Sequence, residues 1–145
     1  MLEKFDYSQV PHDFAHCFNS GCKHSGNCLR YQITSYIPKE CWSVRVINPA
    51  QTVPDGDCPG FMSSQKLKYA YGMSHLLDDL PHRKAKEVRA VMREHYGKTY
   101  FYRLKRMERC FTPEDQQYVG SLFQRFGIES EPTFDRYEEE YNWDR

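Results

Sequence analysis

The sequence predicts a mainly α protein, with a body of three to four helices, a loop-rich N-terminal four-cysteine segment and one or two short strands. Three observations lead to this prediction. Residues 1–62 hold five of the six cysteines, residues 63–128 repeat apolar side chains at helical spacing, and residues 129–145 mix acids with aromatic rings. We therefore expect a cysteine-rich metal-binding segment, a helical body, and an acidic aromatic tail that packs back on the body.

Two short elements are expected in the first region. A helix is predicted in CLRYQITSY, residues 28–36, directly after the third cysteine. The alternating, β-branched stretch WSVRVI, residues 42–47, predicts a strand. The turn-rich sequence NPAQTVPDGDCPG follows it and predicts a loop.

The body begins with residues 63–80, whose leucine, alanine and methionine side chains fit one helical face. Pro81 suits the first turn of a second helix, which Gly97 ends. A short basic helix is expected next. The last helix is the clearest, because Thr112 and Asp115 form a capping-box pattern around a proline.

The composition is that of an ordinary globular chain. Of 145 residues, 39% are hydrophobic and 28% are charged, which excludes a disordered protein. The N-terminus lacks the features of a signal peptide, and no apolar stretch approaches the roughly eighteen residues of a membrane span. We expect a cytoplasmic protein without a membrane partner, in which cysteines serve as thiols or metal ligands more often than as disulfides.

Four cysteines form the main candidate site. Cys17, Cys22 and Cys28 lie within twelve positions, and Cys58 follows in a Cys-Pro turn. Four thiolates satisfy either a tetrahedral zinc ion or an iron–sulfur cluster. The Cys-Pro turn favours a cluster, and three nearby histidines that could replace a cysteine favour zinc: His12, His16 and His24. The metal therefore stays open at this point.

The cysteines also allow interpretations without a metal. The four thiols could be free or redox-active, or joined in disulfides. A catalytic thiol is a further alternative, although His16 and His24 are close to cysteines in sequence, and such neighbours rarely form one nucleophile–base pair. Cys41 and Cys110 stand among apolar residues, so we expect both to be buried small hydrophobes.

Charge is distributed in two opposite blocks. Residues 82–109 hold ten Lys or Arg against three Glu, a net charge of +7, and residues 129–145 hold seven acids against two Arg, a net charge of −5. A basic face beside aromatic rings can bind the phosphate backbone of DNA or RNA. The plain alternative is a solvated surface that the acidic tail neutralises.

The segment 87–128 resembles a helix-turn-helix of the phage-repressor type, in which the helix after the turn glycine reads DNA. The resemblance implies Lys98, Tyr100, Arg103 and Arg106 as nucleic-acid-binding residues, with the last three pointing outward. Lys98 and Arg93 depart from the pattern, because that family has an apolar residue after the glycine and a small residue four positions before it.

The whole chain also resembles a family of small bacterial proteins catalogued only as a domain of unknown function. The stretches CFNSGCKHSGNCLRY, CPGF, GKTYFYRLKR and TPEDQQYVGSLFQRFG carry this resemblance. It implies one unit and no established activity.

No familiar catalytic motif is present. We therefore expect a non-enzymatic metal-containing binding protein. The most specific version of this hypothesis is a nucleic-acid-binding regulator. Two alternatives stay open: an iron–sulfur or thiol redox protein that acts on a partner, and a protein-interaction module whose metal is purely structural. The sequence does not identify a protein partner.

Overall fold

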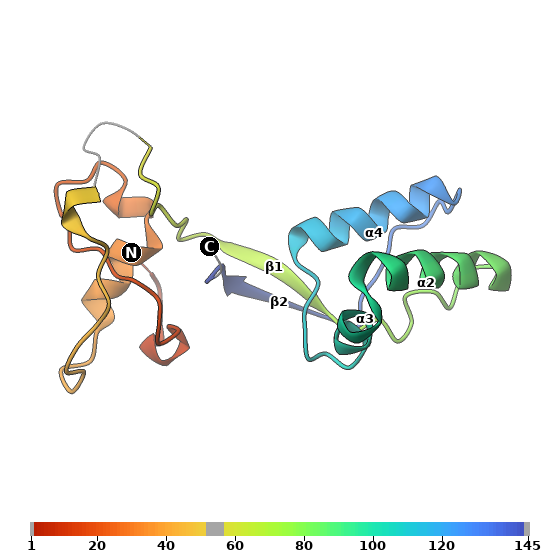
Figure 1. Ribbon diagram of the computed structural model, residues 1–145, viewed down its shortest axis with the longest axis horizontal. Coiled ribbons are helices and arrows are strands. Elements are labelled where there is room, and N and C mark those ends of the chain that lie inside the picture. Colours follow the sequence, from red (N-terminus) through yellow and green to blue (C-terminus); the bar gives the residue numbers. More distant parts are fainter. Residues whose placement is uncertain (1, 52–56, 144–145) are drawn as a thin grey trace. The chain divides into compact units, whose positions relative to one another are not determined.

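The structure, a computed structural model, describes residues 2–51 and 57–143. It divides the chain into two compact units (Figure 1). The N-terminal unit comprises Met1–Lys66 together with Tyr141–Arg145, and the helical unit comprises Leu67–Glu140. Each unit has a hydrophobic core of its own.

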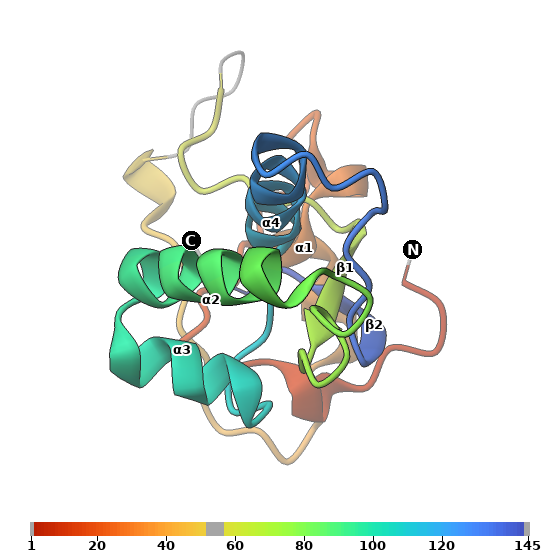
Figure 2. The same ribbon diagram turned by 90° about the vertical axis from the view of Figure 1, so that its right-hand side faces the viewer.

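Three helices form most of the helical unit: α2 (His82–Tyr96), α3 (Lys98–Lys105) and α4 (Pro113–Arg125). Figure 2 shows α2 and α3 one beside the other. These helices confirm the prediction for this stretch of chain. Gly97, with a φ of 80°, is the single residue that separates α2 from α3.

The start of α4 is capped as the sequence indicated. The Thr112 hydroxyl accepts a hydrogen bond from the Asp115 backbone N–H at 3.2 Å, and the Asp115 carboxylate accepts one from the Thr112 backbone N–H at 3.0 Å. This reciprocal pair satisfies two backbone donors that a helix end leaves unpaired. The same carboxylate group accepts the Tyr96 hydroxyl at 3.1 Å, which links the cap of α4 to the end of α2.

The apolar faces of the three helices meet in one core. Met92, Leu104 and Val119 are fully buried there, one from each helix. Phe111 lies before α4 and is equally buried; its ring centroid is 4.6 Å from that of Phe134 in the C-terminal region. Phe134, from the predicted tail, is therefore part of the core of the helical unit.

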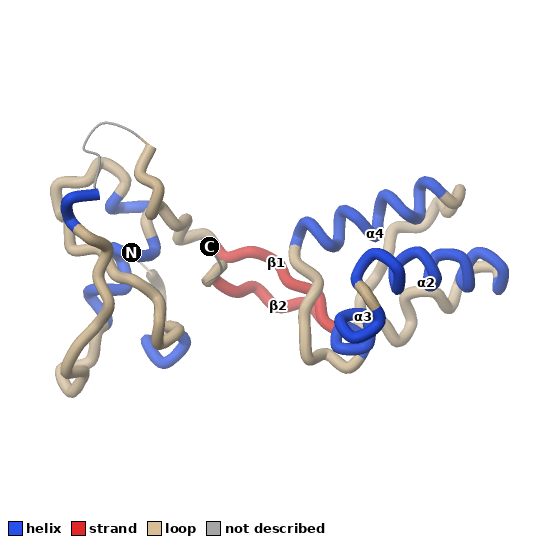
Figure 3. The backbone as a smooth tube through the Cα atoms, viewed as in Figure 1, coloured by secondary structure: helices blue, strands red, loops and turns tan. Residues whose placement is uncertain are grey.

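Two strands, β1 (Lys66–Tyr71) and β2 (Arg136–Tyr141), pair in an antiparallel sheet (Figure 3). The helix predicted over residues 63–80 is therefore wrong. Its first half forms β1, in which Lys66 and Lys68 are exposed while Tyr69 is buried. Burial alternates, as in a strand, over Lys66–Tyr69, and Ala70 is buried as well because it pairs with Phe111.

The second strand comes from the charge run RYEEEY, which lies within the predicted acidic aromatic tail. The Tyr71 hydroxyl donates a hydrogen bond to the Glu140 carboxylate at 3.1 Å, and the Arg136 guanidinium lies 4.7 Å from the centroid of the Tyr71 ring. Burial, together with the neighbouring Glu140, raises the pKa of the Tyr71 hydroxyl. Cross-strand contacts of this kind stabilise a two-stranded ribbon.

The N-terminal unit contains little regular structure. Helix α1 (Leu29–Gln32) continues into a 3-10 turn, Ile33–Tyr36, which confirms the short helix predicted after the third cysteine. The strand predicted over residues 42–47 is wrong, because among the described residues this stretch makes one parallel bridge, between His16 and Val46, and no ladder. An isolated bridge does not make a strand, because a stable sheet needs longer pairing and further neighbouring strands.

The core of the N-terminal unit is small. Its buried apolar residues, within the described ranges, are Leu2, Phe14, Leu29, Ile33 and Tyr141. The ring of Trp143 packs edge-on against Phe14, with centroids 5.1 Å apart.

The aromatic residues of the C-terminal region are thus divided between the two units. Phe134 belongs to the core of the helical unit, whereas Tyr141 and Trp143 pack in the N-terminal unit. Tyr137 is 40% exposed. None of the described helices is both long enough and apolar enough to span a bilayer.

Candidate metal centre

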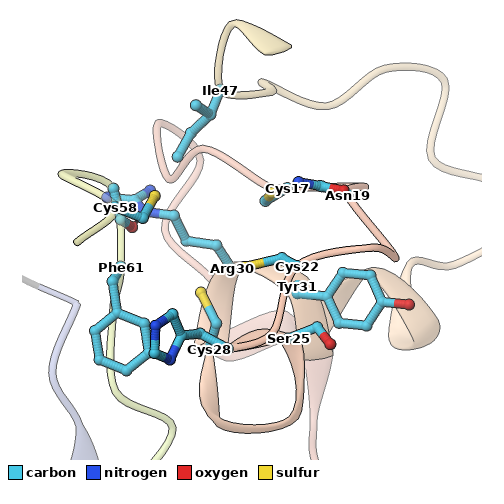
Figure 4. Close-up of a pocket in the computed structure, with 12 residues that line it drawn as sticks. Cys17, Asn19, Cys22, Ser25, Cys28, Arg30, Tyr31, Ile47, Cys58 and Phe61 are labelled. Atoms are coloured by element: carbon cyan, nitrogen blue, oxygen red, sulfur yellow. The ribbon is translucent and has the colours of Figure 1, made fainter. Parts of the chain in front are cut away.

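Cys17, Cys22, Cys28 and Cys58 line one cavity in the N-terminal unit (Figure 4). The cavity has a volume of about 20 Å³. A space of that size holds roughly one water-sized particle. All four side chains are free thiols, and Cys28 is the buried one.

Backbone hydrogen bonds place three of the cysteine-bearing segments. Cys28 forms an antiparallel bridge with Ser63, and the Leu29 N–H donates to the Met62 carbonyl at 2.7 Å. The Cys17 N–H donates to the Arg30 carbonyl at 3.0 Å. These hydrogen bonds hold three of the segments against one another.

Arg30 connects the same three segments through its side chain. Its Nε donates to the Gly60 carbonyl at 2.7 Å, and its Nη1 donates to the Ala15 carbonyl at 2.8 Å. Ala15 is two residues before Cys17, and Gly60 is two residues after Cys58. Arg30 itself follows Cys28 by two residues. Its side chain lines the cavity and extends toward Cys58 in Figure 4.

The environment of Arg30 is that of a structural cation. The residue is 6% exposed, and its guanidinium carbon lies 4.6 Å from the centroid of the Phe14 ring. A buried charge is tolerated when hydrogen bonds satisfy it. Arg30 thus places a fixed positive charge at the wall of the four-cysteine cavity.

The fourth cysteine lies on a separate turn. The Cys22 N–H donates to the Asn19 carbonyl at 3.3 Å, and the Cys22 carbonyl accepts from Ser25 at 3.1 Å. The Asn19 side chain accepts the Gly21 N–H at 3.1 Å. All these bonds are local, so this turn is tied to the rest of the cavity less firmly than the other three segments.

The Cys-Pro turn is tightly packed. The Phe61 N–H donates to the Cys58 carbonyl at 3.0 Å. A Cβ atom on Gly60 would lie 2.5 Å from the Cδ1 atom of Ile47 and 3.7 Å from the Cys58 sulfur. Glycine therefore lets Ile47 close one wall of the cavity.

The thiols surround the cavity without converging on one point. Within residues 2–51 and 57–143, no group of three or more His, Cys, Asp or Glu side chains is positioned to hold a metal ion. The four cysteines thus share a cavity, and the metal itself stays a prediction.

The three neighbouring histidines have different places. His24 lines the cavity, with its ring 5.7 Å from that of Phe61. His16 is buried, and its Nδ1 lies 3.1 Å from the Arg45 carbonyl, so that nitrogen carries the proton. Its Nε2 then accepts the Tyr7 hydroxyl at 2.8 Å. Burial lowers the pKa of His16. His12 is exposed and lines a different cavity.

The two remaining cysteines differ from each other. Cys41 is exposed, and the prediction that it is a buried hydrophobe is wrong, because the loop around it carries Trp42 with 99% of its surface exposed. Cys110 is half-buried in the helical unit, where burial raises the pKa of its thiol. Neither residue lines the four-cysteine cavity.

The residues named for nucleic-acid binding are in different environments. Lys98 and Arg103 are exposed on α3. Tyr100 is half-buried, and its ring stacks on Tyr96 with centroids 5.8 Å apart. Arg106 lies one residue beyond α3 and pairs with Glu108 at 3.0 Å. The one-residue link at Gly97 is also shorter than the three- to four-residue turn of a helix-turn-helix.

The acidic C-terminal region makes no ion pair with the basic segment, as far as the described residues go. Within this part of the chain, the basic segment pairs internally, through Arg83–Glu87 and Arg106–Glu108. The C-terminal region also pairs internally, through Arg136 and Glu138 at 3.1 Å. Most of the Lys and Arg side chains of α2 and α3 are exposed.

Sequence reasoning did not single out Arg30 or Ile47. Arg30 stands in the quoted stretch CLRY, but nothing local distinguishes it from a surface arginine. One feature of the sequence hints that Arg30 is buried: it lies on the predicted short helix, close to the apolar Leu29 and Ile33.

A family model matches residues 1–143 and describes a family of unknown function, DUF6078. The chain belongs to that family, as the resemblance noted in the sequence implied. No protein with a curated description gave a significant match, and no solved structure did so.

Proposed function

For this member of a family of unknown function, we propose that the N-terminal unit binds one zinc ion through Cys17, Cys22, Cys28 and Cys58, and that the protein is a non-enzymatic binding protein. The observation that carries the proposal is that all four cysteines, from separate segments, line one cavity. Thiolates in this number match the closed tetrahedral site of structural zinc.

The size of the cavity favours zinc over an iron–sulfur cluster. A volume of about 20 Å³ accommodates one ion. A four-iron cluster carries four irons and four sulfides, so the cavity would have to open widely to admit it. A single ion requires only that the thiols move inward, and the locally held turn at Cys22 is the segment that can do so.

A metal would have a clear structural role in this unit. The N-terminal unit has a small core and little regular secondary structure. Metal binding contributes most to folding where the core is insufficient. The zinc is therefore structural, and its role is to hold the cysteine-bearing segments together.

The test uses the cysteines that the chain offers as matched controls. Protein purified without added metal should contain about one zinc per chain. Serine in place of Cys17, Cys28 or Cys58 should strongly reduce that content, because each removes one ligand. Serine in place of Cys41 or Cys110 should leave it unchanged, since neither lines the cavity.

Other outcomes would support the rival functions. A brown sample that contains iron and acid-labile sulfide would show an iron–sulfur cluster, and the redox function would then take the place of the zinc proposal. A metal-free protein with a disulfide among the four cysteines would favour a thiol redox protein. A metal-free protein with four free thiols would end the metal proposal.

The helical unit supports a second proposed function, the binding of nucleic acid. The supporting observation is that the basic segment stays exposed and forms no ion pair with the acidic C-terminal region within the described residues. Exposed Lys and Arg bind phosphates and release counterions, so binding would weaken as salt rises. A gel-shift titration of the whole protein at low salt tests it; absence of any shift with DNA and RNA would end this proposal.

A further inference from the structure

We propose that α2 and α3 bind duplex DNA through one stripe of side chains, which we call the basic stripe and which shares only Lys98 with the residues that the sequence suggested. The inference rests on the proposed nucleic-acid function. The stripe consists of Lys86, Arg89 and Arg93 on α2 and Lys98, Tyr102 and Lys105 on α3.

Helical geometry places these residues in two rows, one on each helix. Lys86, Arg89 and Arg93 follow the spacing i, i+3, i+7, so they share one face of α2 over about 10 Å. All three are exposed, while Ala85, Val88 and Met92 line the buried face of the same helix.

The second row lies on α3 and contacts the first at one point. Lys98, Tyr102 and Lys105 follow the spacing i, i+4, i+7 and share one face of α3. The guanidinium carbon of Arg93 lies 5.7 Å from the centroid of the Tyr102 ring. This contact joins the two rows, and both lysines of the α3 row are exposed.

The charges of the stripe are not neutralised by the rest of the described chain. The ion pairs of the basic segment there involve Arg83 and Arg106, which lie outside the stripe. Arg89 and Arg93 are also four residues apart on one helix, and like charges at that spacing oppose each other. A bound polyanion would relieve this repulsion.

Apart from Lys98, the residues suggested by the sequence are less suitable. Arg106 is paired with Glu108, and the bond to Arg106, with a further contribution from the charge of Arg103, lowers the pKa of the Glu108 carboxyl. Glu108 therefore offsets the positive charge on that side of α3. Tyr100 is half-buried against the core.

Duplex DNA is the partner that this surface favours. Binding of single strands depends on exposed aromatic rings on which bases stack. The ring of Tyr102 is half-buried and covered by Arg93, and it packs edge-on against Phe101 at 5.5 Å. The stripe thus presents cations with little stacking surface, which suits contacts to a duplex backbone.

The experiment compares two triple variants of the full chain. The stripe variant carries Lys86→Gln, Arg89→Gln and Arg93→Gln. The control variant carries Arg83→Gln, Arg103→Gln and Arg109→Gln, three cations of the same segment outside the stripe. Both remove three charges, and glutamine keeps the helix propensity of the residues that it replaces. Far-ultraviolet circular dichroism confirms that each variant folds.

Binding is measured by fluorescence anisotropy with a short labelled DNA duplex over a series of salt concentrations. The stripe variant should bind about tenfold more weakly or worse, and its slope of log affinity against log salt should fall by about 2.7, or 0.9 for each phosphate that the variant no longer neutralises. The control variant should change the slope by less than about 1.

The outcomes separate the two levels of inference. If the unaltered protein binds no duplex at low salt, nucleic-acid binding itself is wrong. If it binds but both variants lose affinity equally, the surface binds DNA and the basic stripe is wrong. Tighter binding to the single strand of the same sequence, or to RNA, would overturn the choice of duplex DNA.

Discussion

Replacing Arg30 with methionine should destabilise the N-terminal unit by about 2–4 kcal/mol. Each hydrogen bond from a charged donor contributes about 1.5–3 kcal/mol, so the two bonds to the Ala15 and Gly60 carbonyls contribute about 3–6 kcal/mol. Removing a buried charge recovers part of that loss, because the desolvation cost of the guanidinium disappears. Methionine is unbranched and fills the space of the arginine stem, which limits any cavity.

Urea unfolding followed by tryptophan fluorescence measures this effect. Trp143 packs against Phe14 in the N-terminal unit, so it reports on that unit once Trp42 is replaced by phenylalanine. The matched control is Arg45→Met, because the Arg45 side chain is exposed and its carbonyl remains to accept the His16 bond. An Arg30→Met variant that unfolds within about 0.5 kcal/mol of the control would refute the reasoning.

Three further predictions concern the helical unit. Gly72→Ala should cost about 1–3 kcal/mol in a thermal melt, because φ is +77° there and the new Cβ would collide with Asp135 and Met107. Gly120→Ala, in open space inside α4, should instead stabilise by up to about 1 kcal/mol. Thr112→Ala should cost about 1 kcal/mol by removing the cap of α4, and Thr112→Ser should restore it; equal stability of the two would contradict the capping bond. Burial alone would raise the pKa of Asp135, but hydrogen bonds from the Ser74 N–H and hydroxyl lower that pKa below its ordinary value of 3.8. The stability that the ionised Asp135 provides is therefore present above pH 3.8 and is lost as the pH falls through the lowered pKa. Asp135→Asn should therefore flatten the acid limb of unfolding free energy against pH, and an unchanged limb would rule this out.

The parts of the fold that could be predicted are those with local signals. The three helices of the body follow from apolar spacing, from Gly97 and from the Thr112 cap, all of which act within a few residues. The strand β1 was missed because Leu67 and Ala70 fit a helical face together with the leucines of the next turn. Its partner β2 lies some distance along the chain, so only tertiary pairing decides between helix and strand for this stretch.

The candidate site shows the same division. The close spacing of Cys17, Cys22 and Cys28 is a local signal, and these three line one cavity together with Cys58 from the later Cys-Pro turn. The role of Arg30 depends on carbonyls at positions 15 and 60, which no local pattern connects to it. The position of the basic stripe depends likewise on the contact between Arg93 and Tyr102 across a helix junction.

X-ray absorption at the zinc edge of the protein as purified tests the central claim most directly. A zinc ion held by Cys17, Cys22, Cys28 and Cys58 predicts a first shell of four sulfur atoms at about 2.3 Å and no nitrogen or oxygen neighbour. A shell with one nitrogen at about 2.0–2.1 Å would instead indicate a histidine ligand, with His24 at the cavity as the candidate. The absence of zinc, or a first shell of oxygen ligands, would contradict the proposed site.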